Sequence, residues 1–230
     1  MPQKITPVLP QTVAELRAQI AGEIREQKGL LRKFESALIV SDIDELAELC
    51  PKIDVAFIWP RAWRRVLRIE QELSIQVKRF FLEVWVRHGD HLRQEAYGDL
   101  LLTRALRRLL PPYRGRDRTL FRGELFNNRA RRTYGLAWSS HREVAVAYAE
   151  DRMRRNASGG TVLIRAEVPA AAIITKIPRG HDRYGENEFL VDRTGLKSST
   201  VQVVKKYAHI DWNIRSGREL PVPVAEPGAA

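Results

Sequence analysis

Apolar and polar positions follow two different periods along the chain, and the change falls near its midpoint. Up to about residue 110, apolar side chains recur at spacings of three and four, which is the period of an amphipathic α-helix. The first predicted helix carries an apolar stripe at Val13, Leu16, Ile20 and Ile24, expected to pack on the rest of the chain. A long helix is predicted from Pro60 past Trp85 to Gly89, and another over residues 91–110.

After Pro112 the apolar runs become short and are bounded by glycine, proline and asparagine, which is typical of strands and turns. Extended segments are predicted at 119–123, 134–140, 161–169, 171–177, 189–191 and 201–204. Ser140 is expected to cap the helix that follows it, with Glu143 completing a capping box. These patterns predict an α+β protein with three regions. They are a helical N-terminal half (1–112), a small mixed β-sheet core (113–212) on which it packs, and a disordered tail (213–230).

Composition restricts the class of protein further. With 230 residues, 44% of them hydrophobic, the chain is large enough to bury a substantial core. A single cysteine, Cys50, excludes an intramolecular disulfide framework and fits a reducing compartment. No apolar run approaches the roughly 20 residues needed to span a bilayer, and the N-terminus does not resemble a signal peptide. The sequence therefore predicts a cytoplasmic protein without a membrane partner.

The formal net charge is +11, and arginine is concentrated in one segment. From Arg104 to Arg132 there are ten arginines against Asp117 and Glu124. The guanidinium fork binds phosphate in a bidentate manner, so this segment is a candidate contact for a phosphorylated ligand or a nucleic acid. The alternative is a set of ordinary solvated helix faces. His88 and His91 have a spacing that suits a metal ion, but no third ligand is apparent and no metal site is predicted.

The segment from Tyr184 to Asp192 carries the most specific chemistry. Glu186 and Glu188 are two residues apart and precede an apolar run, so on a strand their carboxylates project from the same face. Two adjacent carboxylates repel each other unless a cation lies between them, and a substrate that becomes cationic in its transition state is one such partner. The alternative interpretation is a solvated strand entrance.

In their order along the chain, four motifs resemble the arginine–serine–glutamate class of mono-ADP-ribosyltransferases, which includes bacterial actin-modifying toxins and phage transferases. The motifs are Phe121-Arg122-Gly123, Tyr134-Gly135 leading to Ser139-Ser140, the Val168-Pro169 strand end, and Glu186-Asn187-Glu188 followed by Phe-Leu-Val-Asp. The resemblance covers about residues 118–206. It implies a core built from two facing sheets, and NAD as the substrate that supplies ADP-ribose.

The resemblance also implies roles for individual residues. Glu188 would stabilise the oxocarbenium ion that forms on the ribose, and Glu186 would orient and deprotonate an arginine acceptor on a protein. The Arg122-Gly123 pair would hold the NAD pyrophosphate. A hydroxyl from Ser139 or Ser140 would brace the catalytic glutamate or contact the ribose.

The serine motif departs from the family pattern. Where the family commonly has Ser-Thr-Ser, this chain has Trp138-Ser139-Ser140. Trp138 could instead stack on the nicotinamide ring, because aromatic faces favour planar cations.

Three functional hypotheses remain open at this point. The first is a transferase that modifies a protein arginine, with an NAD glycohydrolase as a variant that uses water. The second is a non-catalytic protein on a transferase-like fold that binds nucleic acid through Arg104–Arg132. The third is a partner-binding helical adaptor built on residues 1–110.

Overall fold

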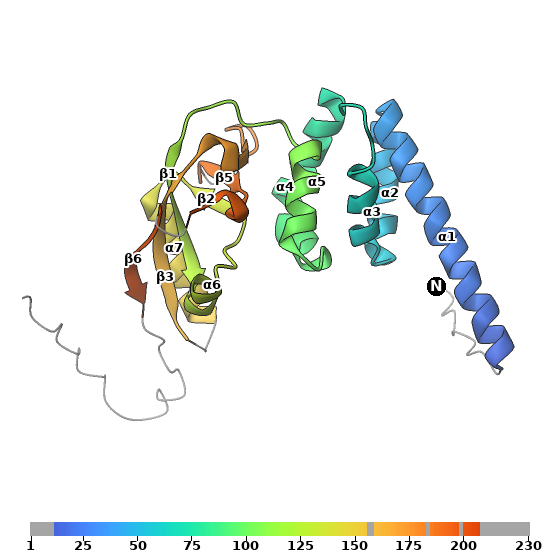
Figure 1. Cartoon of the computed structure of the whole chain (residues 1–230), viewed down its shortest axis with the longest axis horizontal. Helices are drawn as coiled ribbons and strands as arrows, with labels where there is room; N and C mark the ends of the chain where they lie inside the picture. Colours follow the sequence, from blue (N-terminus) through green and yellow to red (C-terminus); the bar gives the residue numbers. More distant parts are fainter. Residues whose placement is uncertain (1–11, 156–158, 183–184, 198–199, 208–230) are drawn as a thin grey trace, which may run out of the picture.

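The computed structural model describes residues 12–155, 159–182, 185–197 and 200–207. In Figure 1 the sheet lies at one end of the molecule, and the helices of the N-terminal half extend from it in successive layers. These helices are α1 (Val13–Val40), α2 (Ile43–Val55), α3 (Trp59–Val66), α4 (Ile75–Glu95) and α5 (Asp99–Leu109). The predicted α+β class is confirmed. The tail predicted at 213–230 lies outside the described residues.

The long helix predicted from Pro60 is interrupted. It is divided into α3 and α4, because the segment between them is fixed to the core by the buried side chains of Ile69 and Leu73. Ser74 then starts α4, since its hydroxyl accepts a hydrogen bond from the amide of Val77 at 3.3 Å.

The predicted helix end at Gly89 is also wrong. The helix α4 continues to Glu95, with a kink at His88, where φ is −135° and ψ is 16°. The helix predicted over 91–110 is therefore shared between the end of α4 and α5. A glycine in a helix can mark a change of direction as well as an end.

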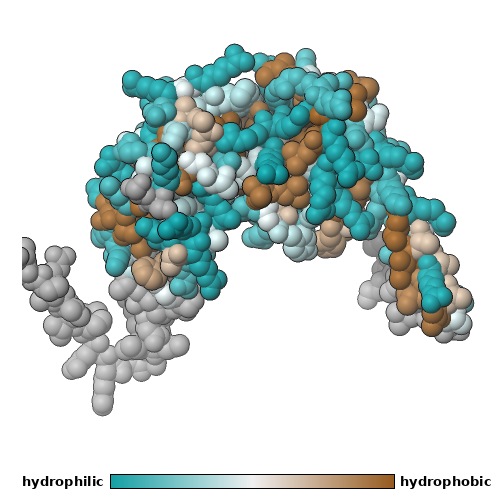
Figure 2. All heavy atoms as spheres, in the orientation of Figure 1, coloured by the Kyte–Doolittle hydropathy of each residue, from teal (hydrophilic) through white to brown (hydrophobic). Residues whose placement is uncertain are grey.

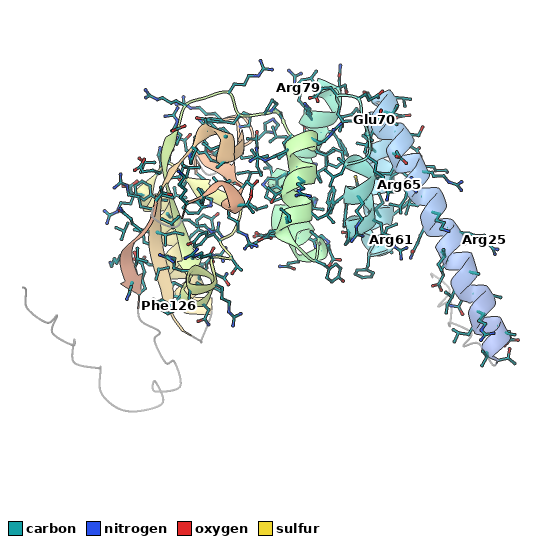
Figure 3. The ribbon with its side chains drawn as sticks, in the orientation of Figure 1. Arg25, Arg61, Arg65, Glu70, Arg79 and Phe126 are labelled. Atoms are coloured by element: carbon teal, nitrogen blue, oxygen red, sulfur yellow. The ribbon has the colours of Figure 1, made fainter. Side chains whose placement is uncertain are left out.

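The apolar stripe of α1 is not packed against this chain. Its members Val13, Leu16, Ile20 and Ile24 are between 40% and 67% exposed, and the buried part of α1 begins at Leu31. Figure 2 shows apolar side chains along this projecting end. Closer to the core, α3 holds α1 through Arg61 and Arg65 (Figure 3), which donate to Gln27 at 2.6 Å and Glu35 at 2.8 Å.

The strands form one sheet in the order β4-β5-β2-β1-β3-β6. They are β1 (Arg118–Leu125), β2 (Ala137–Ser139), β3 (Thr161–Val168), β4 (Ile173–Lys176), β5 (Glu188–Val191) and β6 (Val201–Tyr207). All pairings are antiparallel, so the expectations of a mixed sheet and of two facing sheets were wrong for the described residues. The helix α7 (Arg142–Arg155) connects β2 to β3, which run in the same direction, but β1 lies between them and pairs with both.

Alternation along β5 divides the apolar core. Leu190 faces the helical half and belongs to the same cluster as residues of α1 to α5, together with Leu136, Ile174 and Ile177 from the sheet region. Phe189 and Val191 project to the opposite face and form a second cluster with Trp138. The helical half is thus packed directly on one face of the sheet.

Candidate active site

A cavity of about 650 Å³ lies where the helical half meets the sheet. It is walled by the kinked part of α4, by β1, β2 and β5, by α7, and by the turn before β5. Small-molecule sites commonly enclose about 300–1,000 Å³. Six of the predicted site residues line it, namely Arg122, Gly123, Trp138, Ser139, Glu186 and Glu188. Ser140 is not among the residues of this wall.

The order of the strands brings distant motifs together. Phe121 on β1 is the register partner of Ser139 on β2, and Ser139 is the register partner of Glu188 on β5. Directly opposed residues of antiparallel strands project from the same face. Segments separated by up to 67 positions in the sequence therefore form one short row on one face of the sheet.

Glu186 does not lie on the strand. The strand β5 begins at Glu188, and the preceding residues form a turn in which Gly185 and Asn187 have φ values of 67° and 48°. The carboxylate of Asp182 stabilises this turn by accepting from the amides of Glu186 and Asn187, each at 2.7 Å. Strand alternation was therefore the wrong reason to expect the two glutamates on one side, although both line the cavity.

Two hydroxyl groups determine where Glu186 lies. The Oγ of Ser139 donates to the backbone carbonyl of Glu186 at 2.5 Å, and the hydroxyl of Tyr148 on α7 donates to the Glu186 carboxylate at 2.6 Å. Burial and the charge of Glu186 raise the pKa of Tyr148, so the phenol remains a donor. The carboxylate of Glu186 is thus held against α7.

The Glu188 carboxyl group has a strongly perturbed pKa. Burial is the largest cause and the charge of Glu186 is the next, and together they raise the pKa to about 7. The indole N–H of Trp85 and the charge of Arg122 act in the opposite direction and lower the pKa of Glu188. A carboxyl group that titrates near neutrality in a cavity is typical of catalytic sites.

Arg122 is buried and held between β1 and the segment before β2. Its Nε donates to Glu124 at 2.7 Å and its Nη1 to the carbonyl of Ala137. Gly135 provides the space, because a Cβ there would lie 1.9 Å from the Nη2 of Arg122. The guanidinium is therefore fixed in position before any ligand arrives.

Glu124 is the counter-ion of Arg122 and is fully buried. Burial alone would raise the pKa of Glu124, but the charge and hydrogen bond of Arg122, with hydrogen bonds from Gly135 and Asn128, lower it to about 2. The backbone amide of Gly135 donates to it at 2.9 Å, and the side-chain Nδ2 of Asn128 donates to it at 3.0 Å. Glu124 therefore remains charged and keeps the guanidinium in place.

The two serines differ in position. The Oγ of Ser139 accepts from the amide of His141 at 2.8 Å, just before α7 begins at Arg142. Ser140 was expected to cap this helix, but the observed hydroxyl contact at its start comes from Ser139. The backbone amide of Ser140 donates to the carbonyl of Asn187 at 3.3 Å, which joins β2 to the turn before β5.

Gly123 and Trp138 have packing roles. A Cβ on Gly123 would lie 2.4 Å from the backbone nitrogen of Ala149, so this glycine allows α7 to lie directly on β1. Trp138 is 1% exposed, donates its indole N–H to the carbonyl of Gly135 at 3.1 Å, and packs edge-on against Tyr134. Its buried ring is not available to stack on a nicotinamide, which corrects that expectation.

Sequence reasoning missed Trp85, Tyr148, Arg152 and Asp182, which also line the cavity. The Nη1 of Arg152 lies 4.0 Å from Glu124, and burial together with the nearby charge of Arg122 lowers the pKa of Arg152. A cation in such a position favours an anionic ligand. Tyr148 and Arg152 are four apart on α7, so the helical period contained a signal for this pair.

The arginines of Arg104–Arg132 do not all lie free on the surface. Arg122 is buried, and Arg107 donates to the carboxylate of Asp192 at 3.3 Å. Arg108 donates at 2.6 Å to a backbone carbonyl in the segment between α3 and α4. Several of these side chains therefore make hydrogen bonds within the helical half or between it and the sheet region. This weakens the case for one continuous surface that binds nucleic acid.

Comparison of the chain with models of known protein families, with curated proteins and with solved structures found no match. Among the described residues, no helix is both long and apolar enough to cross a bilayer. Within the same part of the chain, no three His, Cys, Asp or Glu side chains are grouped closely enough to hold a metal ion.

Proposed function

We propose that this protein is a mono-ADP-ribosyltransferase that moves ADP-ribose from NAD to a protein arginine. The proposal is supported above all by one juxtaposition: Glu186 and Glu188 share a cavity with the guanidinium groups of Arg122 and Arg152. NAD carries a cationic nicotinamide at one end and a pyrophosphate in its middle. A cavity with fixed charges of both signs can orient such a molecule.

The reaction assigns a step to each carboxylate. The bond between ribose C1′ and the nicotinamide nitrogen breaks, and its electron pair leaves with neutral nicotinamide. Glu188 stabilises the positive charge that develops on the ribose. A guanidine nitrogen of the acceptor attacks C1′ and loses a proton to Glu186, so the products are ADP-ribosylarginine, nicotinamide and a proton.

The perturbed pKa of Glu188 fits this role in a specific way. An acid that titrates at about 7 is only half ionised at that pH, so the empty site would hold a weakly charged carboxyl group. A bound cationic nicotinamide favours the ionised form, as does a cationic transition state. The carboxylate then becomes fully charged when its partner is present.

The test uses NAD labelled in the phosphate and the full chain, with agmatine as a small guanidine acceptor and with lysate proteins. The wild type is expected to release nicotinamide and to label the acceptor. Glu188→Gln should abolish both, whereas the matched change Glu70→Gln, at an exposed glutamate outside the cavity, should abolish neither. Glu186→Ala should stop labelling but retain slow nicotinamide release.

Other results would contradict the proposal. Nicotinamide release by the wild type without transfer to any guanidine would indicate a glycohydrolase. If the folded wild type neither releases nicotinamide nor labels an acceptor, or if Glu188→Gln remains as active as Glu70→Gln, the transferase mechanism is wrong.

A further inference from the structure

The kink in α4 lies beside the side chain of Trp85. This tryptophan is 7% exposed and lies one turn before the non-helical residue His88. A Cβ on the next residue, Gly89, would lie only 2.9 Å from the Cε2 atom of the indole ring. The ring therefore lies against the backbone of the following turn, in a space that is available only because residue 89 is glycine.

The geometry of β5 directs Glu188 toward this ring. Glu188 and Leu190 are two residues apart on the strand and project from the same face. Leu190 is buried in the same apolar cluster as Trp85. Glu188 therefore faces α4, Trp85 lines the same cavity from that helix, and the indole N–H of Trp85 lowers the pKa of Glu188.

Other tryptophans use their N–H groups differently. Trp59 donates to Asp54 at 2.9 Å, within the helical half, and Trp138 donates to a backbone carbonyl. The indole nitrogen of Trp63 is buried without a partner among the described residues. Of these four, only Trp85 both belongs to the helical half and lines the cavity that contains Glu188.

We propose that Trp85 is a positioning residue for Glu188, so that the helical half completes the active site instead of serving only as a separate adaptor. This inference rests on the proposed function, because it gives Trp85 a task in the same reaction. The indole holds the carboxylate on the side of the cavity where the ribose cation forms. It also favours the ionised form, since a hydrogen bond to a carboxylate stabilises its charge.

Trp85 acts within a densely charged environment. The ionisable side chains that line the cavity around Glu188 come from α4 (Arg87, His88, Asp90, His91, Arg93), β1 (Arg122), α7 (Tyr148, Arg152) and the turn before β5 (His181, Asp182, Glu186). The charges of Glu186 and Asp182 raise the pKa of Glu188 and so oppose its ionisation, whereas the charge of Arg122 lowers this pKa. Removal of the indole N–H leaves this balance of charges in place, so a change in titration reports on the hydrogen bond.

The experiment compares Trp85→Phe with Trp63→Phe in the full chain. Both changes replace a buried indole by a smaller ring, but only the first removes a donor from Glu188. In Trp85→Phe the acid limb of the pH dependence of NAD turnover should move to higher pH by roughly one to two units, the size that a hydrogen bond to a charged group produces. The KM for NAD should change less than kcat, and Trp63→Phe should keep the wild-type profile.

A second variant tests the same contact in case Trp85→Phe fails to fold. Gly89→Ala keeps the tryptophan but places a methyl group against its ring, so it should shift the profile in the same direction. Carbon-13 NMR titration of the Glu188 carboxyl group, assigned by its absence in Glu188→Gln, gives a readout that requires no activity.

The outcomes separate this inference from the proposed function. A higher Glu188 pKa in Trp85→Phe, with the matching shift in turnover, supports it. If turnover is present but neither quantity in Trp85→Phe differs from Trp63→Phe, the positioning role is overturned. A shifted Glu188 pKa in a protein without NAD turnover would support the contact and reject the transferase.

Discussion

Burial of Glu188 should lower the stability of this protein at the pH where the carboxylate is needed. The pKa of Glu188 is raised from an ordinary value of 4.5 to about 7, chiefly by burial. At about 1.4 kcal/mol for each pKa unit, this displacement corresponds to about 3 kcal/mol between the two protonation states. Since the folded-state pKa is the higher one, the protonated form contributes its stability below pH 4.5, and this contribution is lost as the pH rises through about 7.

Replacement of Glu188 by glutamine makes this cost measurable. The amide has nearly the same shape, can still accept from Trp85, and does not ionise. Glu188→Gln is therefore expected to exceed the wild type in free energy of unfolding by about 3 kcal/mol well above neutral pH. Near pH 4.5, where the wild-type carboxyl is protonated in the folded state, the two proteins should be nearly equal.

Urea unfolding followed by tryptophan fluorescence measures both free energies, and an unchanged slope with denaturant shows that the unfolding transition itself is comparable. Glu70→Gln, at an exposed glutamate, serves as the matched control and should show no such dependence on pH. A difference between Glu188→Gln and wild type that is the same at both pH values would refute the reasoning, because it would show that Glu188 does not titrate as a buried acid.

Three further changes test how the cavity wall is built. Gly135→Ala should displace the guanidinium of Arg122, because the new Cβ would lie 1.9 Å from Nη2. Calorimetry should then show NAD binding weakened roughly tenfold or more, and unchanged binding would argue against the phosphate role of Arg122. Gly123→Ala should push α7 away from β1 and reduce stability by about 1–3 kcal/mol in thermal unfolding, whereas an unaltered melting temperature would contradict the close approach. Glu124→Ala should destabilise the fold by about 3–5 kcal/mol by leaving Arg122 buried without its counter-ion; a loss below about 0.5 kcal/mol would show that the pair is not essential.

The sequence predicted the class of the fold and six of the residues that line the candidate site, but for different reasons. Helical periodicity is a local property and identified the helical half, while turn residues and short apolar runs located the strands. The resemblance pointed to Arg122, Ser139, Glu186 and Glu188, and these residues do line one cavity. Their roles in catalysis remain predictions.

What the sequence could not supply depends on contacts between distant segments. Glu186 was assigned to a strand because the Glu-x-Glu spacing suits one, whereas the carboxylate of Asp182 holds that segment in a turn. No local sequence pattern around Trp138 indicated that its ring would be buried in the apolar cluster of the sheet. Trp85 is separated from Glu188 by about a hundred residues, and no local pattern connects an apolar helix position to a carboxylate on a later strand.

The apolar cluster shared by the two halves has a consequence for where the chain can be divided. Leu136, Ile174, Ile177 and Leu190 are covered by the helices, although they follow the change in periodicity near Pro112. A fragment starting at Tyr113 would present these side chains to water and would lose the α4 wall of its cavity. A fragment ending at Pro112 would expose the matching surface of α4 and α5. The most visible boundary in the sequence is therefore a poor place to cut the protein, and an inactive fragment would say nothing about the chemistry of the residues it retains.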